Sequence, residues 1–160
     1  NCHIPPTEAI EMESPVLYLR REMRVDSGGP GTYRGGVGQR LTYRILGDSP
    51  ELQHTSQKSV SLPQGVAGGR PGDGGRWIIN ESLAGEHRLA HAIGDIEPLR
   101  EGDTVTHYTP GGGGYGDPKR RDPAAVARDV RLGFVTPDAA LRDYGVRVDP
   151  TTFAVAELVR

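Results

Sequence analysis

Two glycine-dense runs constrain this chain more than any other feature: DSGGPGTYRGGVG at Asp26–Gly38 and TPGGGGYGDP at Thr109–Pro118. Glycine has no Cβ, so such runs let the backbone approach another backbone or a ligand closely. A flexible linker would be rich in glycine and serine and would not place an aromatic residue and charges at set positions. These runs hold Arg34, Tyr115 and Asp117, so we predict ordered, irregular backbone that the fold requires.

The composition favours turns and short strands and predicts a thin core. Of the 160 residues, 23 are glycine, 13 are proline and only 35% are hydrophobic, which bounds the chain to one domain with little apolar material to bury. We therefore expect the chain to pack against further protein. From its start at Asn1 rather than Met, we also expect that an upstream portion has been removed.

Charge, cysteine content and hydropathy exclude several classes of protein. The net charge is -2 with both signs interspersed, so there is no basic footprint for nucleic acid. The single Cys2 cannot form an internal disulfide, which favours a reducing compartment. No apolar stretch approaches the roughly 18 residues of a membrane helix, and no signal peptide is evident. We expect a soluble, cytoplasmic protein that binds neither nucleic acid nor membrane.

Alternation of hydrophobic and polar residues predicts a series of strands. Between Pro15 and Val25, the residues Leu17, Leu19, Met23 and Val25 share one parity, which predicts a half-buried strand with that side inward. The other predicted strands are Leu41–Ile45, a shorter one around Ser59–Leu62, Trp77–Asn80, His87–His91 and Thr104–Tyr108, with a turn at Arg100–Asp103 before the last.

Capping signals predict two short helices near the C-terminus. Asp122 is a good N-cap, Pro123 suits the first helical position, and Gly133 stands where a helix ends. The same pattern recurs over Thr136–Gly145. Two successive helices are therefore expected there.

The fold class that follows is α+β, mainly antiparallel β with glycine-rich loops, followed by the two short helices. We divide the chain into a glycine-rich β region over 1–118 and a helical segment over 119–160. Two prolines near the N-terminus disfavour a helix, so residues 1–8 are predicted to be extended. Val146–Val148 is predicted to return as a short strand, and residues 151–160 as either a strand or a helix.

Six motifs follow one another in a fixed order along the chain. They are E-x-E followed by DSGGPGTYRGGVG, then P-x-G-x-x-GG-x-PG at Pro63–Gly72, then GD at Gly102–Asp103, then TPGGGGYGDP, then a DV…G…A…YGV tail. In this order they resemble the C-terminal part of the hydantoinase B family, which is similar to ATP-dependent 5-oxoprolinase and to the alpha subunit of acetone and acetophenone carboxylases. The resemblance runs from about Glu8 to Val148, and family members are much longer.

Three departures accompany the resemblance. Lys58 stands where the family has an arginine, which loses the planar two-pronged donor, and Arg76 stands where an asparagine is common. The N-terminal NCHIPPTEAIE also differs from the family's N-T-P-x-E-x-x-E.

The resemblance implies a two-part ATP-dependent enzyme. Its A-type partner, a separate subunit or domain, binds ATP and phosphorylates an amide or enol oxygen, and the B-type subunit then opens a lactam or hydantoin ring or adds a carboxyl group. It also implies that any divalent metal has its ligands outside this chain. We expect the chain to be the C-terminal part of a B-type subunit that hydrolyses a small cyclic amide of the hydantoin or 5-oxoproline type. A ketone carboxylase alpha subunit and a non-catalytic assembly module are the alternatives, and the fragment alone is expected to be inactive.

The first glycine run has two interpretations. Successive glycine N–H groups can form a nest that binds phosphate or carboxylate, with Arg34 adding a charge-assisted bond. Alternatively, the run is a fixed turn between two strands, in which Asp26 caps backbone amides and Arg34 pairs with an acid.

The second glycine run does not match a nucleotide loop. No Lys-Ser or Lys-Thr follows it, as a Walker A loop needs, and Pro118 separates it from the first helix, unlike a dinucleotide fingerprint. We expect Gly111–Gly114 to cross close to another backbone, at a subunit contact or a cavity wall.

Histidines and carboxylates give no complete catalytic or metal set. His87 and His91 would lie roughly 13 Å apart in a strand, too far for one metal ion. Cys2 and His3 could complete a site built upstream. Glu11 and Glu13 would share a face of a strand, either as an acid/base pair or as an exposed edge. The catalytic residues stay unknown, no metal ligands are assigned, and the candidates for substrate or phosphate contact are Ser27, Gly28, Gly29, Arg34, Gly111, Gly112, Gly113 and Gly114.

Overall fold

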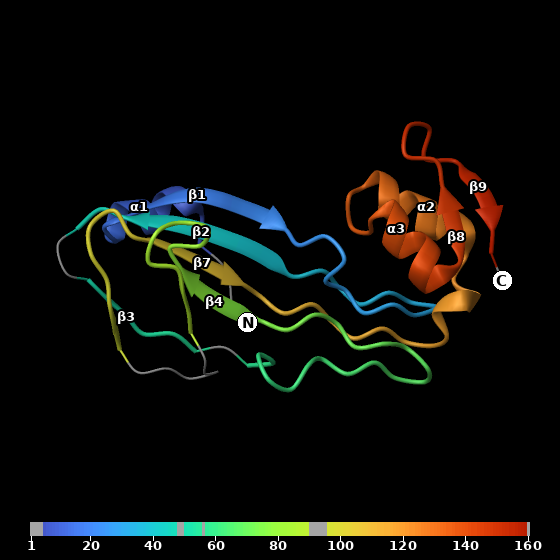
Figure 1. The fold of residues 1–160 in the computed structure, drawn as a ribbon, viewed down its shortest axis with the longest axis horizontal. Helices are drawn as coiled ribbons and strands as arrows, with labels where there is room; N and C mark the ends of the chain where they lie inside the picture. The colour runs from blue at the N-terminus through green and yellow to red at the C-terminus, as the bar shows by residue number, and fades with distance from the viewer. Residues whose placement is uncertain (1–4, 48–49, 56, 90–95, 160) are drawn as a thin grey trace.

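The computed structural model describes residues 5–47, 50–55, 57–89 and 96–159. Figure 1 shows an elongated molecule with an antiparallel sheet at one end, a small helical unit at the other, and extended segments running between them. The class is α+β with antiparallel sheets, as predicted.

A five-stranded antiparallel sheet has the order β1-β2-β7-β4-β5. Its strands are β1 (Val16–Met23), β2 (Gln39–Ile45), β7 (Thr104–Tyr108), β4 (Arg76–Ile79) and β5 (His87–Arg88). The structure thus confirms the strands predicted around residues 15–25, 41–45, 77–80 and 104–108. A second, two-stranded pairing of β3 (Glu51–Leu52) with β6 (Glu97–Pro98) was not predicted.

The prediction that Leu17, Leu19, Met23 and Val25 share one inward side is wrong, because β1 contains a bulge. The register against β2 shifts between Tyr18 and Arg20, and one extra residue sends the following side chains to the opposite face. Leu17 consequently lies opposite Arg44 on one face, whereas Met23 lies opposite Gln39 on the other. The four residues predicted to be inward are 40 to 52% exposed.

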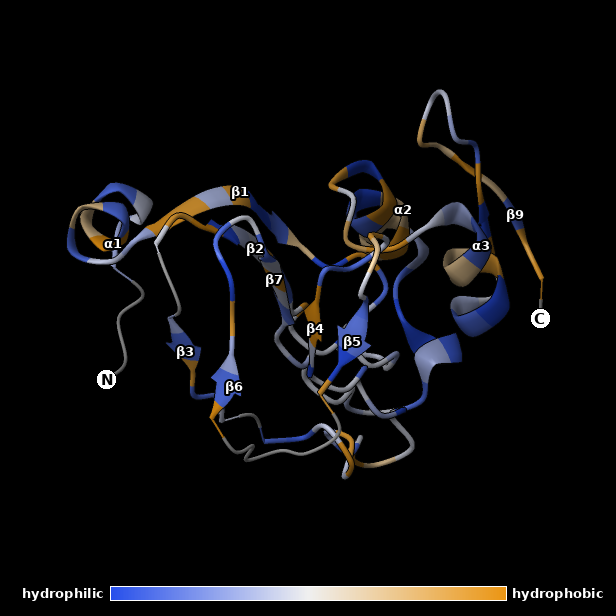
Figure 2. Cartoon of the chain, turned by 60° about the vertical axis from the view of Figure 1, so that its left-hand side comes forward, coloured by the Kyte–Doolittle hydropathy of each residue, from blue (hydrophilic) through white to orange (hydrophobic). Residues whose placement is uncertain are grey.

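The core of the sheet lies on one face, where the register aligns Tyr43, Val105 and Ile79 in one row. Ile45, Leu89 and Leu99 complete this buried cluster. Figure 2 shows β4 as hydrophobic and the neighbouring β5 as hydrophilic, which matches the buried isoleucines of β4 and the exposed residues of β5.

Three further predictions near the strands need correction or confirmation. Ser59–Leu62 is a series of bends without strand pairing. The strand predicted at His87–His91 is only two residues long where it is described, and His91 lies outside the described residues. Chain reversal at Arg100–Asp103 is confirmed, because the Asp103 amide donates to the Arg100 carbonyl at 3.1 Å.

The N-terminal segment is helical where it was predicted to be extended. α1 spans Thr7–Glu13 and follows Pro6, which stands at the N-cap, a place where proline costs no helical hydrogen bond. Glu11 and Glu13 therefore do not share a strand face. The Glu11 carboxylate instead accepts a hydrogen bond from the Tyr18 amide at 2.7 Å.

The C-terminal unit, residues 118–159, follows the predicted caps. α2 (Pro123–Arg131) begins with the Asp122 carboxylate accepting from the Ala124 amide, and Gly133 follows with a φ of 72°. The second helix begins with the Thr136 hydroxyl accepting from the Ala139 amide. It consists of α3 (Pro137–Ala139) and a π-helical turn, η2 (Ala140–Tyr144), and β8 (Val146–Val148) then pairs with β9 (Val155–Leu158).

A second apolar core holds this unit together. Its members come from α2, α3, η2 and β8, and Val126 and Ala140 are completely buried. They share no residue with the cluster on the sheet.

Candidate functional site

Three extended segments, 26–38, 63–74 and 109–117, form a backbone-paired layer that we call the glycine web. They run together between the sheet and the C-terminal unit in Figure 1. Hydrogen bonds cross between all three: the Gly29 amide donates to the Gly112 carbonyl at 2.8 Å, Gly114 to Arg70 at 2.9 Å, and Arg70 to Pro30 at 2.7 Å.

The web is too tight for side chains at its centre. A Cβ on Gly35 would lie 2.0 Å from the Gly112 carbonyl oxygen, and one on Gly111 would lie 1.9 Å from the Ser27 carbonyl oxygen. Neither approach is sterically possible for a residue other than glycine. The predicted crossing of Gly111–Gly114 against another backbone is confirmed.

All eight candidate contact residues lie in this web. The amides of Gly29, Gly111, Gly112 and Gly114 donate to backbone carbonyls within it, so these four donors are already used. The buried Ser27 hydroxyl donates to the Arg24 carbonyl at 2.7 Å and accepts from the Gly38 amide at 2.9 Å. No step of ATP chemistry is assigned to these web residues, and their contact with substrate or phosphate stays a prediction.

Arg34 joins the web to α2. Its Nε donates to Asp129 at 3.0 Å, and Arg121 donates to the same carboxylate at 2.8 Å. All three side chains are at most 14% exposed. In addition, the Asp26 carboxylate accepts from the amide and the hydroxyl of Thr136. These are the contacts of the fixed-turn interpretation, and contact of Arg34 with a substrate remains a prediction.

A cluster that sequence reasoning missed lies where the sheet meets the web. The register places Arg40, Tyr108 and Arg76 directly opposite one another on β2, β7 and β4, so their side chains share the face away from the apolar core. The Arg76 guanidinium carbon lies 4.0 Å from the Tyr108 ring centroid, and that of Arg40 lies at 5.5 Å. Both are cation–π distances.

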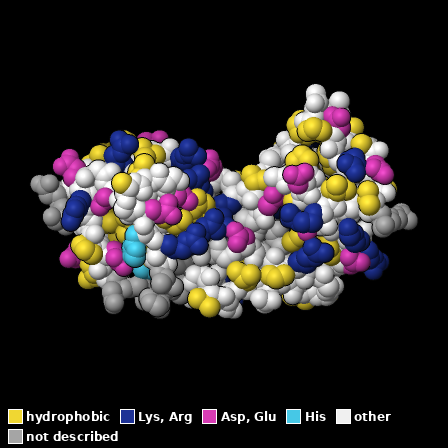
Figure 3. All heavy atoms as spheres, viewed as in Figure 1, with side chains coloured by type: hydrophobic (Ala, Val, Ile, Leu, Met, Phe, Trp, Pro, Cys, Tyr) yellow, Lys and Arg dark blue, Asp and Glu magenta, His cyan; other side chains and the backbone are white. Residues whose placement is uncertain are grey.

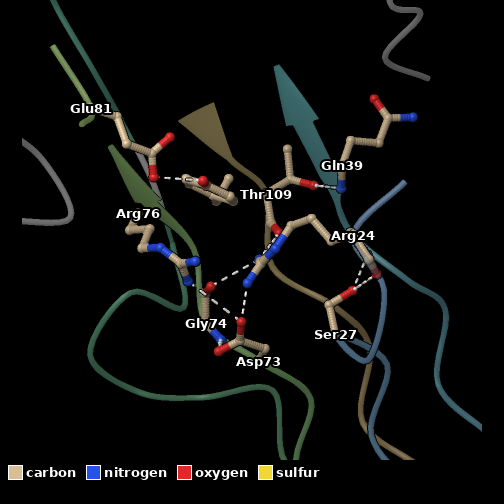
Figure 4. A network of polar contacts seen from close by, with 10 residues as sticks. Arg24, Ser27, Gln39, Asp73, Gly74, Arg76, Glu81 and Thr109 are labelled. Carbon is tan, nitrogen blue, oxygen red and sulfur yellow. Dashed lines mark hydrogen bonds and ion pairs between the residues drawn. The ribbon is translucent and has the colours of Figure 1, made fainter. Parts of the chain in front are cut away.

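Arg24, the residue after β1, brings a third guanidinium to the Tyr108 ring at 5.3 Å. Figure 4 shows it reaching across to the web, where it donates to the carbonyls of Gly74 and Thr109 and pairs with Asp73. Burial lowers the pKa of Arg24, and the charge of Asp73 partly opposes this shift. Arg24 therefore anchors the sheet to the web at residues 73–74.

Glu81 closes the other side of the cluster. Its carboxylate accepts from the Tyr108 hydroxyl at 2.6 Å and from Arg40 at 2.9 Å. Burial alone would raise the pKa of Glu81, but these two hydrogen bonds, together with the charge of Arg40 and a hydrogen bond from Thr106, lower it overall. Burial, reinforced by the Glu81 carboxylate, raises the pKa of Tyr108, so the cluster holds a neutral tyrosine beside a charged carboxylate.

A cavity of about 360 Å³ opens beside this cluster. It is lined by Glu22, Met23, Arg24, Val25, Arg40, Asp73, Arg76 and Tyr108. Arg76 is the most exposed of the three arginines, and its partner Asp73, at 3.5 Å, also pairs with Arg24. The arrangement can receive a small acidic group, although Glu22, Asp73 and Glu81 balance the three arginines in number. Only the strand register could have revealed it, because its members are far apart in the sequence.

Histidine and carboxylate candidates do not gather into a metal site in the described part of the chain, where no group of three potential ligands lies within reach. His107 stacks on Trp77 with ring centroids 3.7 Å apart. Burial, together with the charges of Arg24 and His54, lowers the pKa of His107 to about 4. Cys2 and His3 lie outside the described residues. Among the residues that are described, no helix is long and apolar enough to cross a membrane.

Comparison with known proteins identifies the family of this chain. The family profile for Hydantoinase B/oxoprolinase matches residues 1–118. The chain belongs to this family. It is similar to the beta subunit of the caprolactamase of Pseudomonas jessenii, with 36% identity over 149 residues that cover 89% of this chain and 25% of that protein.

The chain is also similar to two further proteins. The B-type subunit of a putative D-/L-hydantoinase of a Pseudomonas species is 32% identical over 149 residues, covering 92% of this chain and 25% of that protein. The nucleotide-free structure of acetone carboxylase superposes on 97% of this chain and 25% of the matched chain, with a TM-score of 0.82 and 26% identity. The chain thus spans about a quarter of the length of these three relatives. Two of them are named as enzyme subunits, and the third structure concerns ATP-dependent acetone carboxylation.

Proposed function

We propose that this chain is the C-terminal part of a B-type subunit that hydrolyses a cyclic amide of the hydantoin or 5-oxoproline type. In this proposal an A-type partner binds ATP and phosphorylates the amide, and the B-type subunit acts on the phosphorylated intermediate. The support is the 36% identity to a caprolactamase subunit and the 32% identity to a hydantoinase subunit, since both names denote enzymes that act on cyclic amides. Any divalent metal would be held outside this chain, and the location would be the cytoplasm.

Within such an enzyme, we assign to residues 1–118 the shaping of the site and to 119–160 the bracing of the web. The observation behind this assignment is that amides of the web donate to carbonyls of the web. The web can therefore form a rigid wall of the site without a bound ligand. Contacts to substrate would come from its surface, and the candidates remain Ser27, Gly28, Gly29, Arg34, Gly111, Gly112, Gly113 and Gly114.

Two alternatives have support of their own. The TM-score of 0.82 with acetone carboxylase favours a ketone carboxylase alpha subunit. The ion pair of Arg34 with Asp129 favours a non-catalytic module that only holds the assembly together.

The test uses the complete B-type subunit with its A-type partner, incubated with ATP and one candidate substrate at a time. We expect ADP release coupled to ring opening with hydantoin, 5-oxoproline or caprolactam, and none with acetone or acetophenone plus bicarbonate. The reverse pattern would establish the carboxylase alternative.

Arg34→Ala and Asp129→Asn, assayed in the same complex, separate a site role from an assembly role. If Arg34 touches substrate, Arg34→Ala lowers turnover per folded complex well below that of Asp129→Asn, which removes the same ion pair. Equal turnover in the two variants would reject the site role of Arg34.

A further inference from the structure

A second cavity, of about 460 Å³, lies on the C-terminal unit and is separate from the web and the arginine cluster. It forms where the 3-10 turn η1 (Pro118–Arg120), the start of α2, the end of η2 and the β8–β9 ribbon meet. Its lining residues are Lys119, Arg120, Arg121, Asp122, Pro123, Tyr144, Gly145, Val146, Leu158 and Val159.

Most of the wall is apolar. Tyr144 and Val146 belong to the buried core of the unit, whereas Leu158 and Val159 on the ribbon are 47% and 42% exposed. The volume lies within the usual range for small-molecule sites, which are mainly apolar with a few polar groups at fixed places.

The charged groups at this cavity differ in whether they already have a partner of opposite charge. Arg121 is committed to Asp129 at 2.8 Å and to the Thr32 carbonyl at 3.1 Å. Lys119 and Arg120, by contrast, have no carboxylate within 4.0 Å among residues 5–47, 50–55, 57–89 and 96–159. The one acid in the lining, Asp122, is already the N-cap acceptor of α2.

The Lys119 ammonium group lies close to Gly145, which is part of the cavity wall. A Cβ on Gly145 would lie 3.1 Å from the Lys119 Nζ, so the ammonium group sits against a residue of the cavity wall. Figure 3 shows lysine and arginine side chains gathered over this end of the molecule. The cavity therefore combines apolar walls with two cations that lack counter-charges in the described structure.

We propose that this cavity binds an amphipathic anion, in which a carboxylate or phosphate head meets Lys119 and Arg120 and an apolar body packs on Tyr144, Val146 and Leu158. Cations are strong hydrogen-bond donors to such heads, and apolar contact adds affinity in proportion to the area removed from water. The proposal goes beyond ring opening, because no residue of this cavity belongs to the web or to the arginine cluster.

The experiment is calorimetric titration of the complete subunit that carries this chain, with octanoate, octyl phosphate and 1-octanol as probes. We expect saturable binding of an anionic probe at one site and binding at least tenfold weaker for the neutral alcohol. The stronger of the two anions identifies the head group. A hydrogen bond to a charged group contributes about 1.5–3 kcal/mol, so Lys119→Gln/Arg120→Gln should weaken anion binding by about tenfold or more.

Arg131→Gln is the matched control, because this exposed arginine is in the same unit but outside the cavity. The dissociation constant of this variant for the anionic probe should stay within twofold of the wild-type value. Leu158→Asp, on the exposed ribbon, should abolish anion binding, because it puts a negative charge into the apolar wall of the cavity and leaves both cations in place. The proposal is overturned if the subunit shows no saturable anion binding, if octanol binds as tightly as the anions, or if the double variant binds like the control.

Discussion

The glycine web and the C-terminal unit adjoin each other but are stabilised in opposite ways. The C-terminal unit has a conventional core, in which side chains such as Val126 and Ala140 are completely buried. The web has backbone against backbone, with carbonyl oxygens about 2 Å from where a Cβ would stand. A side-chain core can adjust to a substitution by repacking, whereas a backbone-packed layer has no side chain that could move aside.

The largest expected effect comes from Gly35→Ala, which tests this rigidity directly. The added methyl group would lie 2.0 Å from the Gly112 carbonyl oxygen, so the two segments must separate. We expect the free energy of unfolding of the full chain to fall by about 3 kcal/mol or more, measured by urea denaturation.

Gly36→Ala is the control for that prediction. This neighbouring glycine has no atom within 4 Å of the added Cβ, and the free energy of unfolding should change by less than about 1 kcal/mol. Equal losses at both positions would mean that the web is not backbone-packed.

Asp129→Asn tests how the two regions are coupled. The substitution leaves Arg34 and Arg121 without their shared carboxylate in a setting where all three side chains are nearly buried. We expect a loss of about 3 kcal/mol in thermal or chemical denaturation. Glu157→Gln, which removes an exposed pair with Arg147 in the same unit, should cost less than about 1 kcal/mol, and a comparable loss there would contradict the coupling role.

The smallest effect concerns alkaline pH and the C-terminal core alone. Burial raises the pKa of Tyr144 from 10.0 to about 12, so the folded state favours the neutral phenol. Its contribution to stability is complete below pH 10 and is lost as the pH rises toward 12. Tyr144→Phe should therefore show a shallower decline in the free energy of unfolding over this interval than the wild type. Parallel declines would show that Tyr144 is solvated in the folded chain.

Local signals in the sequence were sufficient to predict the two helices of the C-terminal unit, although they left residues 151–160 open between strand and helix. An N-cap bonds within one turn of its helix, so Asp122 and Thr136 predict their helices from local sequence alone. Strand β7 likewise has the predicted bounds, because alternation is a local property. Helix α1 was missed because two prolines were interpreted as a barrier to the helix when the second stands at its N-cap.

What depended on distant partners could not be predicted. The pairing of β3 with β6 joins two-residue strands that carry no pattern of their own. Arg34 was singled out, but its acid lies 95 residues further along the chain. The arginine cluster follows from the register of β2, β7 and β4. That register places Arg40 and Arg76 opposite Tyr108, and it exists only once the sheet has assembled.

The bulge in β1 separates two regular stretches of that strand. Residues 16–18 and residues 20–23 each pair in register with β2, and Leu19 is the one extra residue between them. A bulge bends its strand and increases the local twist, so Leu19 influences the direction in which the strand leaves toward Arg24. Through Arg24, an irregularity of one residue helps to aim the side chain that fastens the sheet to Asp73.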